Sequence, residues 1–138
     1  MPDSNVQTVQ NYFAALAQGD LDAAGALIAD DVVWHQPGGN NLSGDKVGKG
    51  ELFPMLGAMA EFSGGTFAID QVDEVMANGD LVAARIHFKG DHGGVSMAMN
   101  GVDLLRVEDG LIQEVWLFSG DQESEDRFWD HTAGLARG

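Results

Sequence analysis

The sequence predicts an α+β domain in which helices cover one face of a curved antiparallel sheet. Two observations lead to this fold class. Apolar residues of the first half recur at spacings of three and four, as in helices, and from Thr66 onward they recur at every second position, as in strands. The length of 138 residues is that of one ordinary domain, so a single domain over residues 1–138 is expected.

Two helices are expected near the N-terminus, and Gly19 ends the first of them. The apolar stripe of the first helix consists of Val6, Val9, Phe13 and Leu16. Asp20 can cap the second helix, whose buried stripe is predicted at Leu21, Ala24, Leu27 and Ile28. Because the connection between them is so short, the two helices should form a hairpin.

A short strand is predicted next, over residues 32–36, and Pro37 stops it because proline cannot donate to a ladder. A polar loop is expected to follow as far as Gly50. A third helix then carries the apolar stripe Leu52, Phe53, Leu56 and Met59. The glycines after Ser63 end this helix.

Four antiparallel strands are predicted from the alternating pattern, over residues 66–76, 81–89, 95–107 and 111–119. Asn78-Gly79 and Asp109-Gly110 are placed as tight hairpin turns, and residues 90–94 as a longer one. After the last strand, Ser124 could cap a short helix that contains Phe128 and Trp129.

The composition excludes several classes of partner. Asp and Glu number 22 against 7 Lys and Arg, a formal charge of −15, which repels nucleic acid and anionic membrane surfaces. No Lys or Arg precedes Lys46, so an uncharged ligand is favoured. The chain has no cysteine, no signal-peptide pattern and no apolar run of membrane-spanning length, so a cytoplasmic protein is expected.

Metal ions and cofactors are not predicted. The four histidines, His35, His87, His92 and His131, show neither a paired helical spacing nor the carboxylates of a metal site. The glycine-rich segments lack the strand, loop and Lys-Ser/Thr order of a phosphate-binding loop.

Asp103 stands out in the strand pattern. The apolar row Val82, Ala84, Ile86 and Phe88 should face the helices. On the neighbouring strand Asp103 shares one face with the apolar residues Val95, Met97, Met99, Leu105 and Val107. A carboxyl in such a row should protonate or find donors, and in its protonated form it could stabilise an oxyanion in a dry cavity. The alternative is a structural Asp at a bulge beside Gly101.

Several segments carry a resemblance to a known family. They are residues 12–22, residues 29–31, Gln36-Pro37-Gly38, Ser43-Gly44, residues 102–106 and residues 110–114. The first two closely resemble the opening of bacterial ketosteroid isomerases. The chain is thereby identified as a member of the nuclear transport factor 2-like superfamily, in its ketosteroid isomerase-like and SnoaL-like polyketide cyclase branch. The resemblance implies a cone-shaped sheet wrapped around the N-terminal helices, which encloses an apolar pocket without a cofactor.

The resemblance also implies a catalytic site. Tyr12 and Asp103 match the isomerases' two oxyanion-hole donors. Gln36 stands where those enzymes place a catalytic Asp, and an amide cannot act as the base. His35 is an alternative base, because Trp34-His35-Gln36-Pro37 resembles the His-x-Pro segment of SnoaL-like cyclases. The catalytic proton is expected to be handled by His35, by Gln36 or by a water that they orient. Strand parity aims His35 away from the face of Trp34 and Gln36 unless the chain bends at Pro37.

A second resemblance is weaker. Arg85 and His87 resemble the Arg and the acid of limonene-epoxide-hydrolase-like relatives, which sit two residues apart on this strand. Here His replaces the acid, and Leu117 occupies the place of the third member. The epoxide hydrolase triad is therefore incomplete.

The predicted function is an acid–base isomerase, cyclase or dehydratase that acts on an uncharged, apolar carbonyl compound of polycyclic or polyketide-like type. The predicted ligand-binding residues, for which plain core is the alternative, are Trp34, Phe53, Met59, Phe88, Met99, Trp116 and Phe118. One alternative is a non-catalytic small-molecule-binding protein that lost the base. Another is an interaction module, a homodimer joined through the open sheet face by a set such as Trp116 and Phe118.

Overall fold

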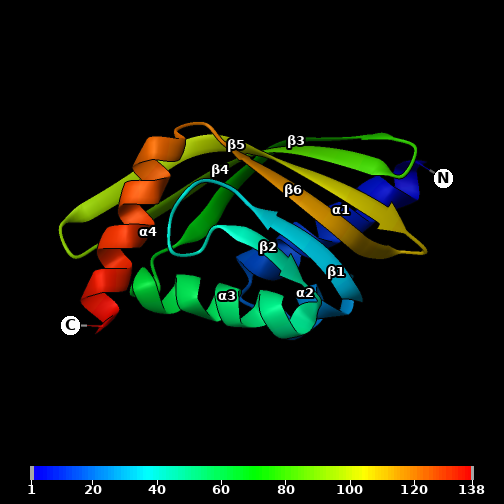
Figure 1. The fold of residues 1–138 in the computed structure, drawn as a ribbon. Coiled ribbons are helices and arrows are strands. Elements are labelled where there is room, and N and C mark those ends of the chain that lie inside the picture. The colour runs from blue at the N-terminus through cyan, green and yellow to red at the C-terminus, as the bar shows by residue number, and fades with distance from the viewer. Residues whose placement is uncertain (1, 138) are drawn as a thin grey trace.

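A six-stranded sheet and four helices make up residues 2–137, which the computed structural model describes (Figure 1). In chain order the elements are α1 Pro2–Ala17, α2 Leu21–Ala26, β1 Ile28–Gln36, β2 Gly44–Val47, α3 Lys49–Phe62, β3 Ala68–Asn78, β4 Leu81–His92, β5 Val95–Glu108, β6 Leu111–Ser119 and α4 Gln122–Arg137. The strand order is β2-β1-β6-β5-β4-β3. The predicted α+β class is confirmed.

The sheet is mixed, which corrects the expectation of purely antiparallel pairing. β1 lies beside β6 and runs parallel to it, whereas all other neighbours are antiparallel. A parallel neighbour needs a long crossover connection, and here α3 and the four strands β2, β3, β4 and β5 lie between β1 and β6 in the chain. The first and last strands of the chain therefore meet inside the sheet.

The helical hairpin forms with Asp20 as the predicted cap, whose carboxylate accepts from the backbone N–H of Ala23 at 3.0 Å. The second helix is shorter than predicted, because Ile28 already pairs with Ile112 of β6 and so begins β1. Leu21, predicted to be buried, is 62% exposed. Strand pairing thus ends α2 at Ala26 and draws Ile28 out of the predicted helical stripe.

The region after α2 contains more strand than predicted. β1 begins at Ile28 rather than Val32, and β2 was expected to be loop. β2 is a short edge strand with mostly exposed side chains, and it pairs with β1 at Val33 opposite Val47. Backbone hydrogen bonds form this edge, and because its side chains remain mostly exposed, the sequence shows no apolar alternation.

The four predicted C-terminal strands are confirmed, and the predicted turn at Asp109-Gly110 forms. The turn predicted at Asn78-Gly79 lies one residue later, at Gly79-Asp80, because Asn78 still pairs with Leu81. The hairpin between β4 and β5 is tighter than expected, because Gly90 still pairs with Met97 and the turn is made by Gly93 and Gly94. Both glycines have positive φ, which a residue with a side chain rarely adopts.

The last helix is longer than predicted and is capped by another residue. α4 spans 16 residues, and its first turn is capped by Asp121, whose carboxylate accepts from the N–H of Ser124 at 3.2 Å. Phe128 and Trp129 are fully buried. The indole ring of Trp129 lies 5.4 Å from the ring of Phe67, which anchors α4 against the interior.

The core lies between the inner face of the sheet and the helices. The predicted inner row of β4 and the row of β5 that contains Asp103 are both buried, as expected. Figure 1 shows α1, α2 and α3 on one side of the sheet. α4 lies at one end of the sheet, where it contacts β5 and α3. In residues 2–137 no helix is long and apolar enough to cross a membrane.

Candidate functional site

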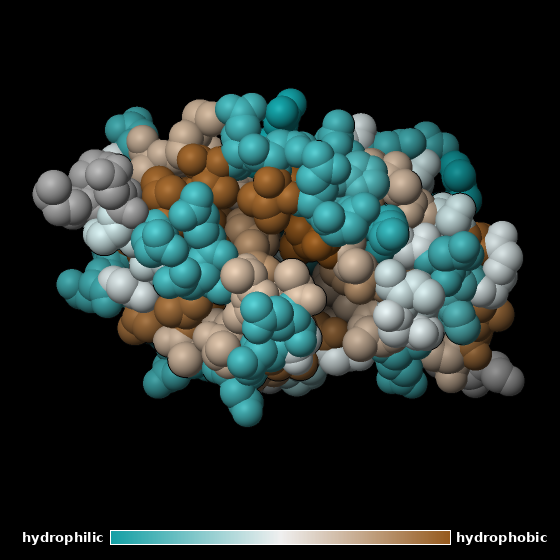
Figure 2. All heavy atoms as spheres, turned by 180° about the vertical axis from the view of Figure 1, so that it is seen from behind, coloured by the Kyte–Doolittle hydropathy of each residue, from teal (hydrophilic) through white to brown (hydrophobic). Residues whose placement is uncertain are grey.

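A cavity of about 490 Å³ opens between the inner face of the sheet and helices α1, α3 and α4. Apolar side chains make most of its wall, among them Leu16, Leu56, Met59, Phe67, Ile86, Phe88 and Leu117. Figure 2 shows hydrophobic side chains gathered around a hollow on the face behind that of Figure 1. The polar groups of the wall are those of Tyr12, Trp34, Gln36, Asp70, Asp103, Ser119 and Glu125.

Tyr12 and Asp103 both line this cavity, and each is only 3% exposed. Tyr12 comes from α1, where its ring packs 5.2 Å from that of Phe13. Asp103 comes from the middle of β5, on the face that looks toward the helices. The structure thus brings together the two residues that strand parity and resemblance indicated.

Burial controls the protonation of both groups. Removal from water, and then the negative charge of Glu125, raises the pKa of Asp103 to about 7. Burial and the nearby charge of Asp103 raise the pKa of Tyr12 above its ordinary value. Tyr12 therefore carries its proton, and Asp103 carries one below pH 7, so both can donate hydrogen bonds into the cavity.

Gln36 lines the cavity beside Trp34, as parity predicted. The indole N–H of Trp34 donates to the Gln36 side-chain oxygen at 2.9 Å, and both residues are buried. The Gln36 side chain is thus held in one orientation by its neighbour on the same face of β1. An amide can donate and accept hydrogen bonds, but it cannot remove a proton.

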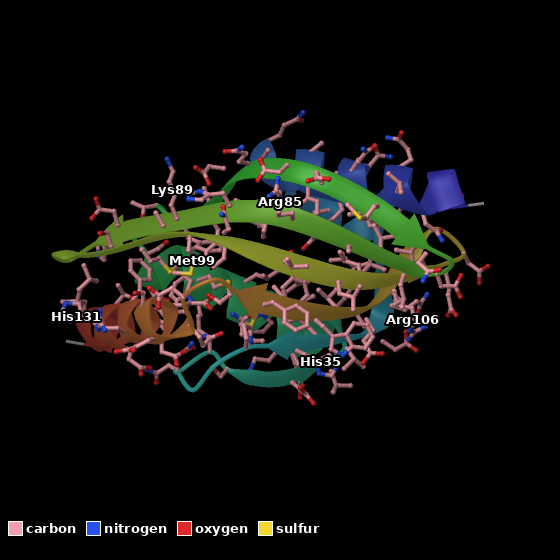
Figure 3. The ribbon with its side chains drawn as sticks, turned by 90° about the horizontal axis from the view of Figure 1, so that it is seen from above. His35, Arg85, Lys89, Met99, Arg106 and His131 are labelled. Carbon is pink, nitrogen blue, oxygen red and sulfur yellow. The ribbon has the colours of Figure 1, made fainter. Side chains whose placement is uncertain are left out.

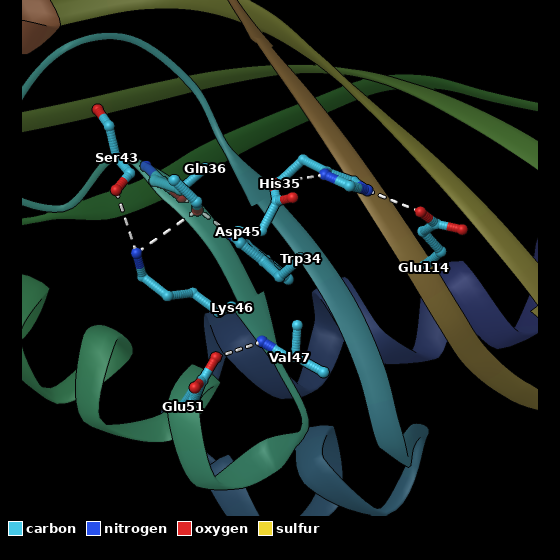
Figure 4. A network of polar contacts seen from close by, with 10 residues as sticks. Trp34, His35, Gln36, Ser43, Asp45, Lys46, Val47, Glu51 and Glu114 are labelled. Carbon is cyan, nitrogen blue, oxygen red and sulfur yellow. Dashed lines mark hydrogen bonds and ion pairs between the residues drawn. The ribbon is translucent and has the colours of Figure 1, made fainter.

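The structure places His35 outside the cavity, on the opposite face of β1. Its Nδ1 lies 2.7 Å from the Asp45 carboxylate and its Nε2 lies 2.7 Å from that of Glu114 (Figure 4). Its ring stacks on Trp116 at 5.4 Å. Regular pairing of β1 with β2 continues through Gln36, so the bend that would have aimed His35 inward does not form.

His35 should make the stability of the fold pH-dependent. The hydrogen bond with Glu114, more than that with Asp45, raises the pKa of His35 above 6.5. When folding raises the pKa of a group, that group stabilises the folded state fully at pH values below its pKa in the unfolded chain. This stabilisation is lost as the pH rises through the pKa of the group in the folded protein. In urea denaturation, His35→Gln should therefore cost roughly 1 kcal/mol more at pH 6 than at pH 9.

An Asp45→Asn variant serves as the control for that measurement. It leaves the imidazole in place but removes one of its two carboxylate partners. Its unfolding free energy should show a smaller pH-dependent loss of the same sign. A His35→Gln cost that stays constant from pH 6 to pH 9 would show that the imidazole acts only by packing on Trp116.

The predicted ligand-binding residues divide between the cavity and other places. Trp34, Met59 and Phe88 line the cavity. Phe118 borders it but is 57% exposed. The remaining three lie elsewhere. Phe53 is exposed on α3, and Trp116 lies on the outer sheet face with His35. Met99 lines a separate surface pocket, where its sulfur accepts a hydrogen bond from the Ser119 hydroxyl. The homodimer through that face stays a prediction.

The epoxide hydrolase triad is not assembled. Arg85 points to the outer side of the sheet, where it meets the carboxylates of Asp73 and Glu74 (Figure 3). The His87 ring meets Asp70 at 2.7 Å. Leu117 lines the cavity on the opposite face. The three positions therefore do not share one site.

Asp70, Ser119 and Glu125 are polar residues of the cavity that the sequence analysis missed, and Glu125 is the more deeply buried of the two carboxyls among them. It is 4% exposed, near the start of α4, and its carboxylate accepts from the Trp129 indole N–H at 3.2 Å and from the Gln122 amide at 3.1 Å. Burial raises its pKa, and the hydrogen bonds from Trp129 and Gln122 oppose that rise. Its helical spacing to Phe128 and Trp129 was the available signal, because all three share one face of α4.

The charge of the cavity is acidic. Asp70, Asp103 and Glu125 contribute carboxyl groups, and none of the described residues of its wall is a Lys, Arg or His. Across residues 2–137 no group of three or more His, Asp or Glu side chains could hold a metal ion. The polar chemistry of this wall is that of carboxyl, phenol, hydroxyl, indole and amide groups.

Comparison with solved structures supports the predicted fold. A Xanthomonas campestris protein of unknown function with a cystatin-like fold is 48% identical, with a TM-score of 0.88 over 91% of this chain and 97% of that one. A nuclear transport factor 2-like protein of Burkholderia xenovorans shares the fold at 22% identity, with a TM-score of 0.79 over 94% and 98% of the two chains. The predicted cystatin-like fold is thereby confirmed.

Sequence comparison points the same way. Residues 9–115 match the model of the SnoaL-like domain. An uncharacterised protein found in Mycobacterium tuberculosis and Mycobacterium bovis is 28% identical over 128 residues, which are 92% of this chain and 97% of that protein. Tyr12 and Asp103 lie inside the matched segment, and Glu125 lies beyond it.

Proposed function

Because the chain belongs to the SnoaL-like domain family, we propose that it is an acid–base isomerase, cyclase or dehydratase of an uncharged, apolar carbonyl compound. The observation that carries this proposal is the pairing of two buried proton donors, Tyr12 and Asp103, in one largely apolar cavity. Such a pair suits a reaction in which negative charge develops on a carbonyl oxygen.

The chemistry follows from what the two donors can do. When a carbon beside a carbonyl loses a proton, the carbonyl oxygen becomes an enolate oxygen. The Tyr12 hydroxyl and the protonated Asp103 carboxyl can both donate to that oxygen. Little water competes in a cavity walled by apolar side chains, so these bonds are stronger than they would be in water.

The charge of the wall supports the choice of substrate class. Two buried carboxyls, Asp103 and Glu125, face the cavity, and the described residues of its wall bring no cation. A carboxylated or phosphorylated compound would bury its own charge beside them without compensation. An uncharged molecule with a polycyclic or polyketide-like apolar frame avoids this cost.

Binding of 2-naphthol tests the proposal, because its naphtholate form mimics an enolate on an apolar bicyclic frame. In calorimetric titrations, Tyr12→Phe and Asp103→Leu should each weaken the affinity roughly ten- to hundredfold, since each removes a hydrogen bond to a charged oxygen. Trp116→Phe, on the outer sheet face, is the matched control and should leave the affinity unchanged. If the unmodified protein and the three variants bind 2-naphthol with equal affinity, Tyr12 and Asp103 do not form an oxyanion hole.

A second candidate is a binding protein without catalysis. The observation that favours it is Gln36, an amide held by Trp34 at the position where the related isomerases carry a carboxylate. Native mass spectrometry of gently purified protein separates the two functions. A small molecule released chemically unchanged after incubation supports binding alone, whereas its conversion supports the enzyme.

A further inference from the structure

We propose that Glu125 is the general base of this cavity and removes a proton from the carbon beside the substrate's carbonyl group. This assignment rests on the proposed function, which names two donors for the oxygen but no group that takes the proton. Glu125 comes from α4, whereas Tyr12 and Asp103 come from α1 and β5. All three side chains line the same cavity.

The hydrogen bonds of Glu125 fix its carboxylate without consuming it. Trp129 donates to one oxygen at 3.2 Å and Gln122 donates to the other at 3.1 Å. Each carboxylate oxygen has two lone pairs, so both retain acceptor capacity after these bonds. Trp129 is fully buried in turn, so the group that orients the base is itself immobilised by packing.

The other polar groups of the wall fit the role less well. Gln36 and Ser119 have no protonation chemistry near neutral pH. Asp70 is bonded to His87, which lowers its pKa and makes it a weaker base. Asp103 is needed as a donor. Glu125 combines burial, which strengthens it as a base, with donors that keep an ionised carboxylate in place.

The negative charge of Glu125 also acts on Asp103, because it raises the pKa of that neighbouring carboxyl. An ionised Glu125 therefore favours the protonated form of Asp103 that can donate to an oxyanion. Two carboxyls in one cavity thus take opposite roles, one as base and one as donor, and the charge of the first supports the proton of the second.

The step balances within the site. The carbon–hydrogen bond breaks and the proton moves to Glu125, while the electron pair forms a carbon–carbon double bond and the carbonyl electrons move to the oxygen. Tyr12 and Asp103 donate to that oxygen. Glu125 then returns the proton to a carbon of the enolate, and the carbonyl group forms again. No oxidant, reductant or metal takes part.

Proton exchange on a simple ketone measures this step. 2-Tetralone in D2O, with the unmodified protein, should lose its α-proton signals in the NMR spectrum faster than without protein. Glu125→Gln should slow the protein-dependent exchange at least hundredfold, the usual contribution of a general base. Glu123→Gln, on the same helix with an exposed carboxylate, is the matched control and should exchange at the unmodified rate.

In Glu125→Gln the amide oxygen can still accept from Trp129, and the NH2 group can donate to the Gln122 side-chain oxygen once that amide turns over. The fold should therefore survive, and 2-naphthol affinity should change only a few-fold. If Glu125→Gln fails to fold, Glu125→Asp takes its place. Its exchange should be at least tenfold slower than that of the unmodified protein, because the Asp side chain is one methylene shorter and holds the carboxylate farther from the substrate. Unchanged exchange in the variant, or no exchange by the unmodified protein while 2-naphthol still binds, overturns the assignment. If the unmodified protein does not bind 2-naphthol at all, the proposed function itself is contradicted.

Discussion

Asp103→Asn is expected to make the protein more stable above neutral pH. Folding raises the pKa of Asp103 from 3.8 to about 7, so the folded state binds its proton more tightly than the unfolded state does. Between these two values the unmodified protein loses stability as pH rises, by about 1.4 kcal/mol per unit, or about 4 kcal/mol in all. An Asn side chain avoids this loss, because it is uncharged in both states.

Urea denaturation of both proteins at several pH values checks this expectation. The Asn variant should gain only about 1–2 kcal/mol at pH 5 and several kcal/mol at pH 8. Tyr12 and Glu125 are the titratable groups that act on Asp103, and both remain in the variant. Asp31→Asn, at an exposed position of β1, is the control and should show no such pH-dependent gain.

The opposite sign would carry a clear meaning. If Asp103→Asn loses several kcal/mol at pH 8, Asp103 is an ionised acceptor held by charge-assisted hydrogen bonds. The oxyanion-hole assignment would then fall. If the gain is found, the protein retains a destabilising acid in its cavity, as expected for a residue kept for function rather than stability.

Trp129→Ala is expected to be the most damaging single truncation, with a loss of about 3–5 kcal/mol in the free energy of unfolding. The indole ring is fully buried and packs against Phe67 and Phe128 at 5.4 and 5.0 Å. Removing it leaves a large void between α4 and the interior, and it also takes one donor from the buried Glu125 carboxylate. Chemical denaturation at neutral pH measures the loss.

Trp129→Phe separates packing from hydrogen bonding. It keeps most of the ring volume but removes the N–H, so its cost should be about 1–3 kcal/mol, that of a buried acceptor left without this donor. Trp116→Ala, on the outer sheet face, is the matched control and should cost less than Trp129→Ala because that ring is only partly buried. Equal costs for Trp116→Ala and Trp129→Ala would contradict the role of α4 as an anchored part of the cavity wall.

Periodicity predicted the parts of the fold that bury apolar side chains. The inner row of β4, the row of β5 and the stripe of α1 carry their buried residues at the spacing of their element, so their faces could be assigned. β2 and the first residues of β1 were missed. β2 is formed by backbone pairing with the neighbouring β1, and Ile28 pairs with Ile112 of the distant β6, and neither pairing leaves a mark on the side-chain pattern.

The candidate site was predictable to the same degree. Asp103 interrupts an apolar row, so its burial could be inferred from the strand alone, and the resemblance added Tyr12. Strand parity correctly placed His35 on the face of β1 opposite to Trp34 and Gln36. A bend at Pro37 would have turned His35 toward the cavity, and this bend does not form. Glu125 was missed because α4 was expected to be short and capped at Ser124, which would have placed Glu125 at its exposed beginning.

The position of β1 beside β6 also determines when the cavity can exist during synthesis. Tyr12 leaves the ribosome early, Asp103 follows after most of the sheet, and Glu125 emerges only with the last helix. Neither β1 nor the inner face of β5 has its final neighbours until β6 and α4 have been translated. A nascent chain therefore completes the cavity only late, when β6 and α4 meet segments made earlier, and such closure between distant segments is intrinsically slow.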